Sequence, residues 1–158
     1  MQLQLDALLT PERTLCRAPA TSKHQVLENC ASFFCESFGA GAEVALTADL
    51  LLQSLLARER LGSTGLGNGI AIPHCRLKPI DTVMAALVTL GEPIDFDAVD
   101  GSPVDIVFIL LAPERALQEH LQALAALAEL CNCAEFRQSV RAATTAPQLY
   151  RAAVDFRT

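Results

Sequence analysis

Apolar residues recur at helical spacing in two segments of the first half of the chain. Ser22-Lys-His-Gln25 has the S-x-x-Q form of a capping box, which predicts a helix that begins there and ends at Gly39 and Gly41. Thr47 is the predicted N-cap of a second helix that runs towards Gly62. The residues predicted to face inward are Val26, Leu27, Cys30, Phe33 and Phe34 in the first helix and Leu51, Leu52, Leu55 and Leu56 in the second.

The middle of the chain changes to a pattern that predicts strands. Residues 62–69 hold four glycines in eight positions and predict a loop, which leads into a short apolar strand at 70–72 that ends at Pro73. Residues 83–90 predict a second strand, and residues 104–111 predict a third. The third is almost entirely apolar, which is typical of a strand covered on both faces.

The remainder of the chain is predicted to be helical. Beyond Pro113 we expect a long helix with one apolar side turned inward, followed by one or two shorter helices around Pro147. Helices at both ends with strands between them indicate an α/β fold of three layers. We expect a single domain over residues 1–158. The predicted inward side of the long helix consists of Leu117, Leu121, Leu124, Ala128 and Cys131.

Composition and charge exclude several classes of protein. The chain has 158 residues, of which 51% are hydrophobic and 19% are charged, so disorder is excluded. A net charge of −6 without a Lys/Arg cluster argues against nucleic acid as a partner. There is no basic leader and no apolar run of about 18 residues, so we expect a cytoplasmic protein without membrane insertion. No C-x-x-C pair occurs and no metal is predicted; the cysteines expected to be reduced and mostly buried are Cys16, Cys30, Cys35, Cys75, Cys131 and Cys133.

Two segments imitate ligand-binding loops without matching them. Glycines allow backbone N–H groups to close on an anion, and Gly62 and Gly67 have the spacing of a P-loop. However, Asn68 stands where a P-loop lysine must neutralise phosphate charge. The acidic run at 95–101 resembles a calcium loop, yet Val99 occupies a ligand position. We therefore expect no nucleotide at the glycine loop and a solvated turn at 95–101.

His74 is the strongest candidate for chemistry. It follows Pro73 at the carboxyl end of a predicted strand, and this edge of an α/β sheet commonly holds ligands. A neutral imidazole, with a pKa of about 6.5, is a good nucleophile at pH 7. The pattern alone also fits a surface histidine at 74, a packed histidine at His120 and an Arg58 that only complements a helix dipole. Cys75 is expected to be a bystander, because neighbours in extended chain point apart.

The residues around His74 resemble a known family. The run Arg58-Glu-Arg-Leu-Gly-Ser-Thr-Gly-Leu-Gly-Asn-Gly-Ile-Ala-Ile-Pro-His74 resembles the active-site signature of mannitol/fructose-type enzyme IIA domains of the bacterial phosphoenolpyruvate-dependent phosphotransferase system. Two later stretches are similar to the nitrogen-regulatory branch of that family: Ile94-Asp-Phe-Asp-Ala-Val-Asp-Gly101 through Pro103-Val-Asp105, and Leu111-Ala-Pro-Glu114 with His120-Leu121. The resemblance extends from about Leu5 to the C-terminal helices.

The resemblance implies a mixed β-sheet flanked by helices and a phosphotransferase-system phosphocarrier that needs no cofactor and no metal. It implies that His74 accepts the phosphoryl group as a covalent intermediate. Arg58, sixteen residues earlier, and His120 match the family's arginine and second histidine, so we expect a charge stabiliser and a hydrogen-bonding helper. The family often has Gly where this chain has Cys75. Backbone N–H groups of the loop are expected to bind the phosphoryl oxygens, at Ser63, Thr64, Gly65, Gly67, Asn68 and Gly69.

The resemblance also implies partners. The phosphoryl donor is expected to be a histidine-phosphorylated carrier, NPr, which is the nitrogen-branch relative of HPr. Regulated targets are expected as well, and the family's association with nitrogen metabolism and potassium handling points to potassium-transport and sensor-kinase proteins. Two other functions stay open at this stage. One is a sugar-specific fructose or mannitol enzyme IIA that passes phosphate to a transporter IIB subunit, and the other is a non-enzymatic binding module.

Overall fold

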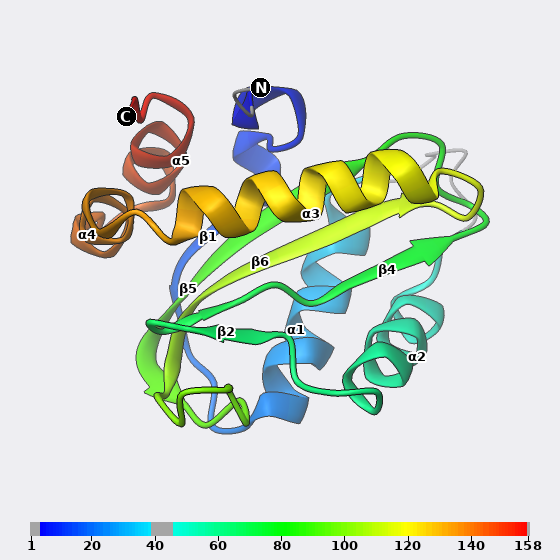
Figure 1. Cartoon of the computed structure of the whole chain (residues 1–158), viewed down its shortest axis with the longest axis horizontal. Helices are drawn as coiled ribbons and strands as arrows, with labels where there is room; N and C mark the ends of the chain where they lie inside the picture. The colour runs from blue at the N-terminus through cyan, green and yellow to red at the C-terminus, as the bar shows by residue number, and fades with distance from the viewer. Residues whose placement is uncertain (1–3, 39–45, 158) are drawn as a thin grey trace.

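The computed structural model describes residues 4–38 and 46–157, and its centre is a six-stranded mixed sheet (Figure 1). The strand order is β1-β5-β6-β3-β2, and β4 also pairs with β6. No helix in the described ranges is both long and apolar enough to span a membrane. The strands are β1 (Thr14–Ala18), β2 (Gly65–Gly67), β3 (Ile70–Ala71), β4 (His74–Leu77), β5 (Met84–Ile94) and β6 (Val104–Pro113).

The long strands β5 and β6 pair antiparallel and form the middle of the sheet. Every residue of β6 except Asp105 is buried, as its apolar sequence predicts for a strand covered on both faces. β1 runs parallel to β5, and β3 and β4 run parallel to β6. The strands predicted at 83–90 and 104–111 are confirmed, and both extend beyond the predicted ends.

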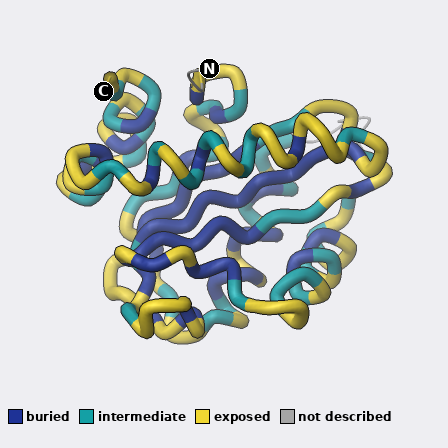
Figure 2. The backbone as a smooth tube through the Cα atoms, in the orientation of Figure 1, coloured by how far each residue is buried: buried dark blue, intermediate teal, exposed yellow. Residues whose placement is uncertain are grey.

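Helices cover both faces of this sheet. One apolar cluster packs α1 and α2 against one face, and a second packs α3, α4, α5 and the N-terminal segment against the other (Figures 1 and 2). The predicted three-layer α/β fold with a mixed sheet is therefore confirmed. The helices are α1 (Lys23–Glu36), α2 (Ala48–Glu59), α3 (Leu117–Cys131), α4 (Ala134–Ala142) and α5 (Ala146–Val154), preceded by short 3-10 turns at Leu5–Ala7 and Pro11–Arg13.

The first two helices begin where their caps predict. The Ser22 hydroxyl accepts a hydrogen bond from the Gln25 backbone N–H, and Thr47 caps α2 in the same way. The capping box is not reciprocal, because the Gln25 side chain accepts from the N–H and hydroxyl of Thr21 rather than from Ser22. The helix α1 ends at Glu36, and the predicted stop at Gly39 and Gly41 lies outside the described residues.

Strands β1, β2 and β4 were not predicted. They are five, three and four residues long and each carries exposed positions, so their apolar periodicity is too short to recognise. The glycine loop therefore contains a strand at Gly65–Gly67, which pairs antiparallel with β3. The strand predicted at 70–72 is confirmed as the short strand β3, and the chain pairs with β6 again in a separate strand, β4, from His74 onwards.

The predicted inward side of α3 is wrong at its first two positions, Leu117 and Leu121, whereas Cys131 is buried and Leu124 and Ala128 pack against the apolar cluster as predicted. Leu117 and Leu121 are 49% and 54% exposed, whereas His120 is only 5% exposed. The buried positions of the helix are His120, Leu127 and Cys131, so its first turn points a histidine at the sheet and two leucines outward. His120 turns inward and packs beside the His74 ring on the sheet, although the apolar pattern of the helix places leucines on that side.

A close approach at Gly65 gives a test of the packing between β2 and the 95–98 segment. A Cβ at Gly65 would lie 2.8 Å from the Cβ and 2.9 Å from the Cα of Ala98. Because backbone must then shift, we expect Gly65→Ala to lower the free energy of unfolding by about 1–3 kcal/mol in urea titrations. Gly91→Ala is the matched control, since its nearest contact is an ordinary 3.5 Å. Equal midpoints for the two variants would contradict the close approach.

Candidate active site

His74 lies at an edge of the sheet, between the two helical layers. β3 and β4 pair with β6 in one continuous register, with Ala71 opposite Val107 and His74 opposite Leu110. The chain thus forms one strand interrupted at Ile72 and Pro73. β2 covers only the β3 part of that strand, so within the described residues β4 has a paired neighbour on one side alone. The sequence predicts His74 at the carboxyl end of the 70–72 strand. In the structure His74 follows the break at Ile72 and Pro73 and begins β4, where the chain rejoins β6.

Two hydrogen bonds fix the His74 imidazole. Its Nδ1 lies 2.7 Å from the carbonyl oxygen of Ile72. A carbonyl only accepts, so Nδ1 carries the proton and Nε2 keeps its lone pair. Arg58 Nε donates to His74 Nε2 at 3.2 Å, which is consistent with that assignment. Burial lowers the pKa of His74, and the nearby Arg58 charge acts in the same direction. The ring is thus a neutral imidazole with a nucleophilic Nε2.

Arg58 reaches the ring from the last turn of α2. Its Nη1 also donates to the carbonyl oxygen of Gly62 at 2.8 Å, which ties the guanidinium to the start of the glycine loop. A guanidinium has five N–H donors in a rigid fork and is always charged. Beside Nε2 it is suited to hold the oxygens of an anionic group that bonds to this nitrogen.

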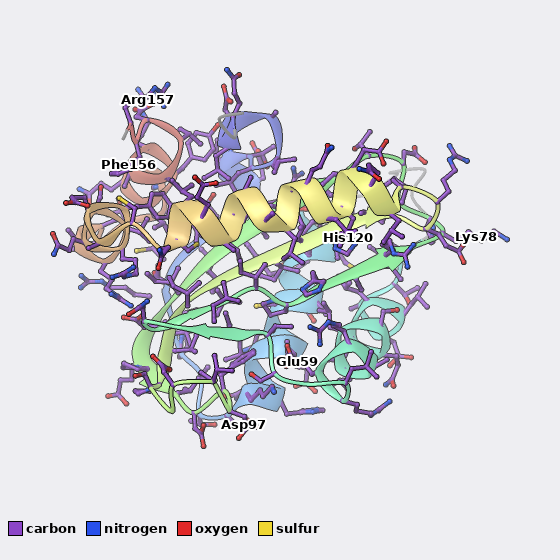
Figure 3. The ribbon with its side chains drawn as sticks, in the orientation of Figure 1. Glu59, Lys78, Asp97, His120, Phe156 and Arg157 are labelled. Carbon is purple, nitrogen blue, oxygen red and sulfur yellow. The ribbon has the colours of Figure 1, made fainter. Side chains whose placement is uncertain are left out.

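His120 approaches from the opposite layer, from the first turn of α3 (Figure 3). The two imidazole rings have centroids 5.3 Å apart and cross at 66°. His120 Nε2 is buried and has no hydrogen-bond partner among the described residues. Burial lowers the pKa of His120 to about 4, and the charge of Arg76, together with any positive charge on His74 when that ring is protonated, acts in the same direction. A neutral ring with an unsatisfied buried nitrogen is typical of a functional site.

Three N–H groups of the glycine loop already have side-chain partners inside the protein. The Thr64 N–H donates to the Glu59 carboxylate at 3.1 Å, and the Gly65 N–H donates to the Ser63 hydroxyl at 3.0 Å. The Asn68 N–H donates to Asp100 at 3.0 Å. The predicted role of this loop in binding phosphoryl oxygens stays a prediction, and at these three positions it would require an exchange of hydrogen-bond partners.

The far end of the loop is held by residues that the sequence did not indicate. Arg141 of α4 donates to both carboxylate oxygens of Asp105 and to the Asn68 carbonyl. Gly69 lies directly against this pair and has a φ of +82°, so only glycine fits there without strain. Gly67, with a φ of +103°, lies beside Asp100. These glycines shape the loop rather than offering an anion site by themselves.

The near end of the loop is held by a partly buried ion pair that also had no recognisable sequence signal. The Glu59 carboxylate lies 2.9 Å from the Lys23 ammonium and accepts hydrogen bonds from the N–H and the hydroxyl of Thr64. The Ser63 hydroxyl donates to the carbonyl of Phe96 at 2.6 Å. Phe96 is fully buried, so the 95–101 segment is not simply a solvated turn. These contacts join residues that are far apart in sequence.

The cysteines have no chemical role that the structure supports. All six are free, but only Cys30 and Cys131 are buried, so the expectation of mostly buried cysteines is wrong. Burial raises the pKa of Cys75 to about 12, which keeps its thiol protonated. Cys75 packs against the apolar cluster under α1 and α2 and has no left-handed φ, so glycine is not needed at this position. In the described part of the chain, no group of three metal-ligating side chains converges.

Comparisons with known proteins agree with this site. A family model described as the phosphoenolpyruvate-dependent sugar phosphotransferase system, EIIA 2, matches residues 7–153. A nitrogen regulatory protein of Pseudomonas aeruginosa is 44% identical over 153 residues, which cover 97% of this chain and 96% of the relative. The crystal structure of nitrogen regulatory protein IIA-Ntr from Neisseria meningitidis superposes with a TM-score of 0.83 at 33% identity and covers 93% of this chain and 97% of that one.

A more distant structure shares the fold alone. The mannitol IIA protein of Escherichia coli superposes with a TM-score of 0.71 at 17% identity, over 91% of this chain and 97% of that chain. Among these three proteins, the two nitrogen regulatory proteins share 33% or more of their sequence with nearly the whole chain. The chain belongs to the EIIA 2 family of the phosphoenolpyruvate-dependent sugar phosphotransferase system, in its nitrogen-regulatory branch.

Proposed function

We propose that this protein is a nitrogen-regulatory phosphocarrier that accepts a phosphoryl group on Nε2 of His74 from a histidine-phosphorylated carrier of the NPr or HPr type. The observation that carries the proposal is the orientation of the His74 ring. Its proton is held on Nδ1 by the Ile72 carbonyl, and its Nε2 lone pair lies beside the Arg58 guanidinium. Membership of the phosphotransferase-system family supports the same reading.

The transfer needs no proton from the protein. The phosphorus–nitrogen bond of the donor histidine breaks as the bond between phosphorus and His74 Nε2 forms, and the donor nitrogen recovers its lone pair. His74 gains positive charge as it bonds to phosphorus, and the Ile72 carbonyl stabilises the Nδ1–H that carries part of it. Such transfers depend on an in-line acceptor and on charge stabilisation of the phosphoryl oxygens.

Arg58 and His120 would supply that stabilisation from opposite sides. Arg58 donates to Nε2 before transfer, so its N–H must move to a phosphoryl oxygen when the nitrogen becomes bonded. His120 brings a buried Nε2 that has no partner among the described residues and that a phosphoryl oxygen would satisfy. The result is about two negative charges on one surface, which is a switch that partner proteins can read. We propose that regulation of partners, including potassium-transport or sensor-kinase proteins, depends on this switch.

The first test is the intact mass of the protein after incubation with phosphoenolpyruvate, the first-stage phosphotransferase enzyme and the carrier. We expect one acid-labile phosphoryl group on the wild type and none on His74→Ala. His24→Ala is the matched control, because His24 is an exposed histidine on α1 and should not change the result. Nitrogen-detected NMR should place the group on Nε2. A phosphoryl group on His74→Ala, or no transfer to the wild type from either carrier, would contradict the proposal.

Replacing Arg58 tests the role of the guanidinium. Arg58→Lys keeps the charge but loses the fork, and the shorter set of donors cannot bind both Gly62 and His74. We expect phosphoryl transfer to slow by about 10- to 100-fold in rapid-quench kinetics. Arg60→Lys, two residues along on the exposed side of the helix end, should transfer at the wild-type rate. Wild-type kinetics in Arg58→Lys would exclude the clamp.

The pKa directions predict the pH response of the two rings. The pKa of His74 is lowered and that of His120 is about 4, so both rings stay neutral as the pH falls through the ordinary imidazole value of about 6.5. As the pH falls, the unfolded chain binds protons on these rings at a higher pH than the folded chain does. The stability that the neutral rings contribute is therefore lost as the pH falls from about 6.5 to their folded pKa values. An NMR titration of the ring nitrogens measures both midpoints. A His120 midpoint at 6.5 or above would contradict this assignment.

A further inference from the structure

Glu59 stands next to Arg58 in sequence, but its carboxylate contacts Thr64 and Lys23 rather than the His74 ring. Its side chain is only 6% exposed, and both carboxylate oxygens are engaged. One oxygen accepts from the Thr64 N–H and lies 2.9 Å from Lys23 Nζ, and the other accepts from the Thr64 hydroxyl. Thr64 itself is 4% exposed. The last residue of α2 is thereby bound both to the first residue of α1 and to the residue before β2.

The contacts of Lys23 and Ser63 extend this anchor. The Lys23 ammonium lies 4.9 Å from the centroid of the buried Phe96 ring, which adds a cation–π contact to the ion pair. The Ser63 hydroxyl donates to the Phe96 carbonyl. The loop from Gly62 to Thr64 is thus held by contacts of Ser63 and Thr64 in addition to the bond from Arg58 to the Gly62 carbonyl.

This anchor determines where the Arg58 guanidinium can lie. Arg58 is in the last turn of α2, where the carbonyls of Arg58 and Glu59 accept short-range bonds from the N–H groups of Leu61 and Gly62. The side-chain contacts of Glu59 add to these bonds and fasten the helix end to the rest of the protein. Its side chain spans from the Gly62 carbonyl to His74 Nε2. Both the helix end that carries Arg58 and the loop that supplies the Gly62 carbonyl are held by Glu59.

We propose that Glu59 is a positioning residue for phosphoryl transfer, which holds Arg58 on His74 Nε2 by fastening the end of α2 to Thr64 and Lys23. The proposal rests on the proposed function, since the transfer is the process that Arg58 serves. Among the described residues, Glu59 makes no hydrogen bond or ion pair with the His74 ring or with the guanidinium. Apart from the effect of its charge on His74, we infer that it acts on transfer through Arg58.

The direct electrostatic effect of Glu59 has the opposite sign, and this separates the two explanations. The Glu59 charge raises the pKa of His74, whereas the Arg58 charge lowers it. If Glu59 acted on His74 only through its charge, its removal would lower the pKa of His74. If Glu59 positions Arg58, its removal releases the guanidinium and raises the pKa of His74, as Arg58→Met also should.

The experiment uses the full chain with Glu59→Leu and Lys23→Met combined, because removing the carboxylate alone would leave the partly buried Lys23 ammonium with only the exposed Asp97 carboxylate, 3.8 Å away, as a partner. Thr64→Val is a second, milder variant that keeps every charge and removes only the hydroxyl bond to Glu59. NMR titration of the His74 ring and rapid-quench transfer from the phosphorylated carrier are measured for each variant. Both are repeated in an Arg58→Met background.

We expect the double variant to raise the pKa of His74 and to slow transfer by about 10-fold or more, with a smaller change of the same sign in Thr64→Val. In the Arg58→Met background the same replacements should have little further effect, because the residue they position is already gone. An unchanged or lowered pKa of His74, or an equal slowing with and without Arg58, would overturn the proposal. If the double variant does not fold, Thr64→Val decides.

Failure of the proposed function gives a different result. If the wild type accepts no phosphoryl group from either carrier, the phosphocarrier assignment falls. The His74 titrations in the wild type and the variants would still show whether Glu59 holds Arg58 on the ring, because they require no transfer.

Discussion

The break in the edge strand at Ile72 and Pro73 is the constraint on which the site depends. Proline has no N–H to give to a neighbouring strand, yet its carbonyl accepts from Leu110, and the chain rejoins β6 in the same register at His74. The Ile72 carbonyl accepts from the His74 ring instead of completing a regular ladder. A rigid sheet thereby fixes both the position of the imidazole and the nitrogen that carries its proton.

Because β4 has no further strand beside it among the described residues, both helical layers reach the same ring. α2 brings a permanent cation from one side, and α3 brings a second, neutral imidazole from the other. Burial and the guanidinium both disfavour a charged His74. The layered fold thus keeps the His74 imidazole neutral with a positive charge close by, a combination that an isolated histidine in water does not have.

Sequence patterns predict the parts of this arrangement that are local. Ser22 and Thr47 locate two helices because caps act within three residues, and the apolar run of β6 identifies the buried centre of the sheet. The family motif identifies His74, Arg58 and His120 as candidates. The phase of α3 was not predictable from apolar spacing, since His120 takes an inward place and Leu117 and Leu121 face outward. The Glu59–Thr64 and Arg141–Asp105 contacts depend on how distant segments pack, which no local pattern encodes.

The polar groups under the site carry a cost in stability that apolar packing would avoid. A partly buried ion pair such as Lys23–Glu59 gains little over well-packed apolar residues, and the unpartnered His120 Nε2 is unfavourable while it stays unsatisfied. Natural sequences depart from the most stable choice mainly where function requires it. Both departures lie within one or two contacts of His74 Nε2. A phosphoryl group on His74 Nε2 would accept hydrogen bonds from His120 Nε2 and from the Arg58 guanidinium. The phosphorylated protein would thereby recover stability that the free protein lacks.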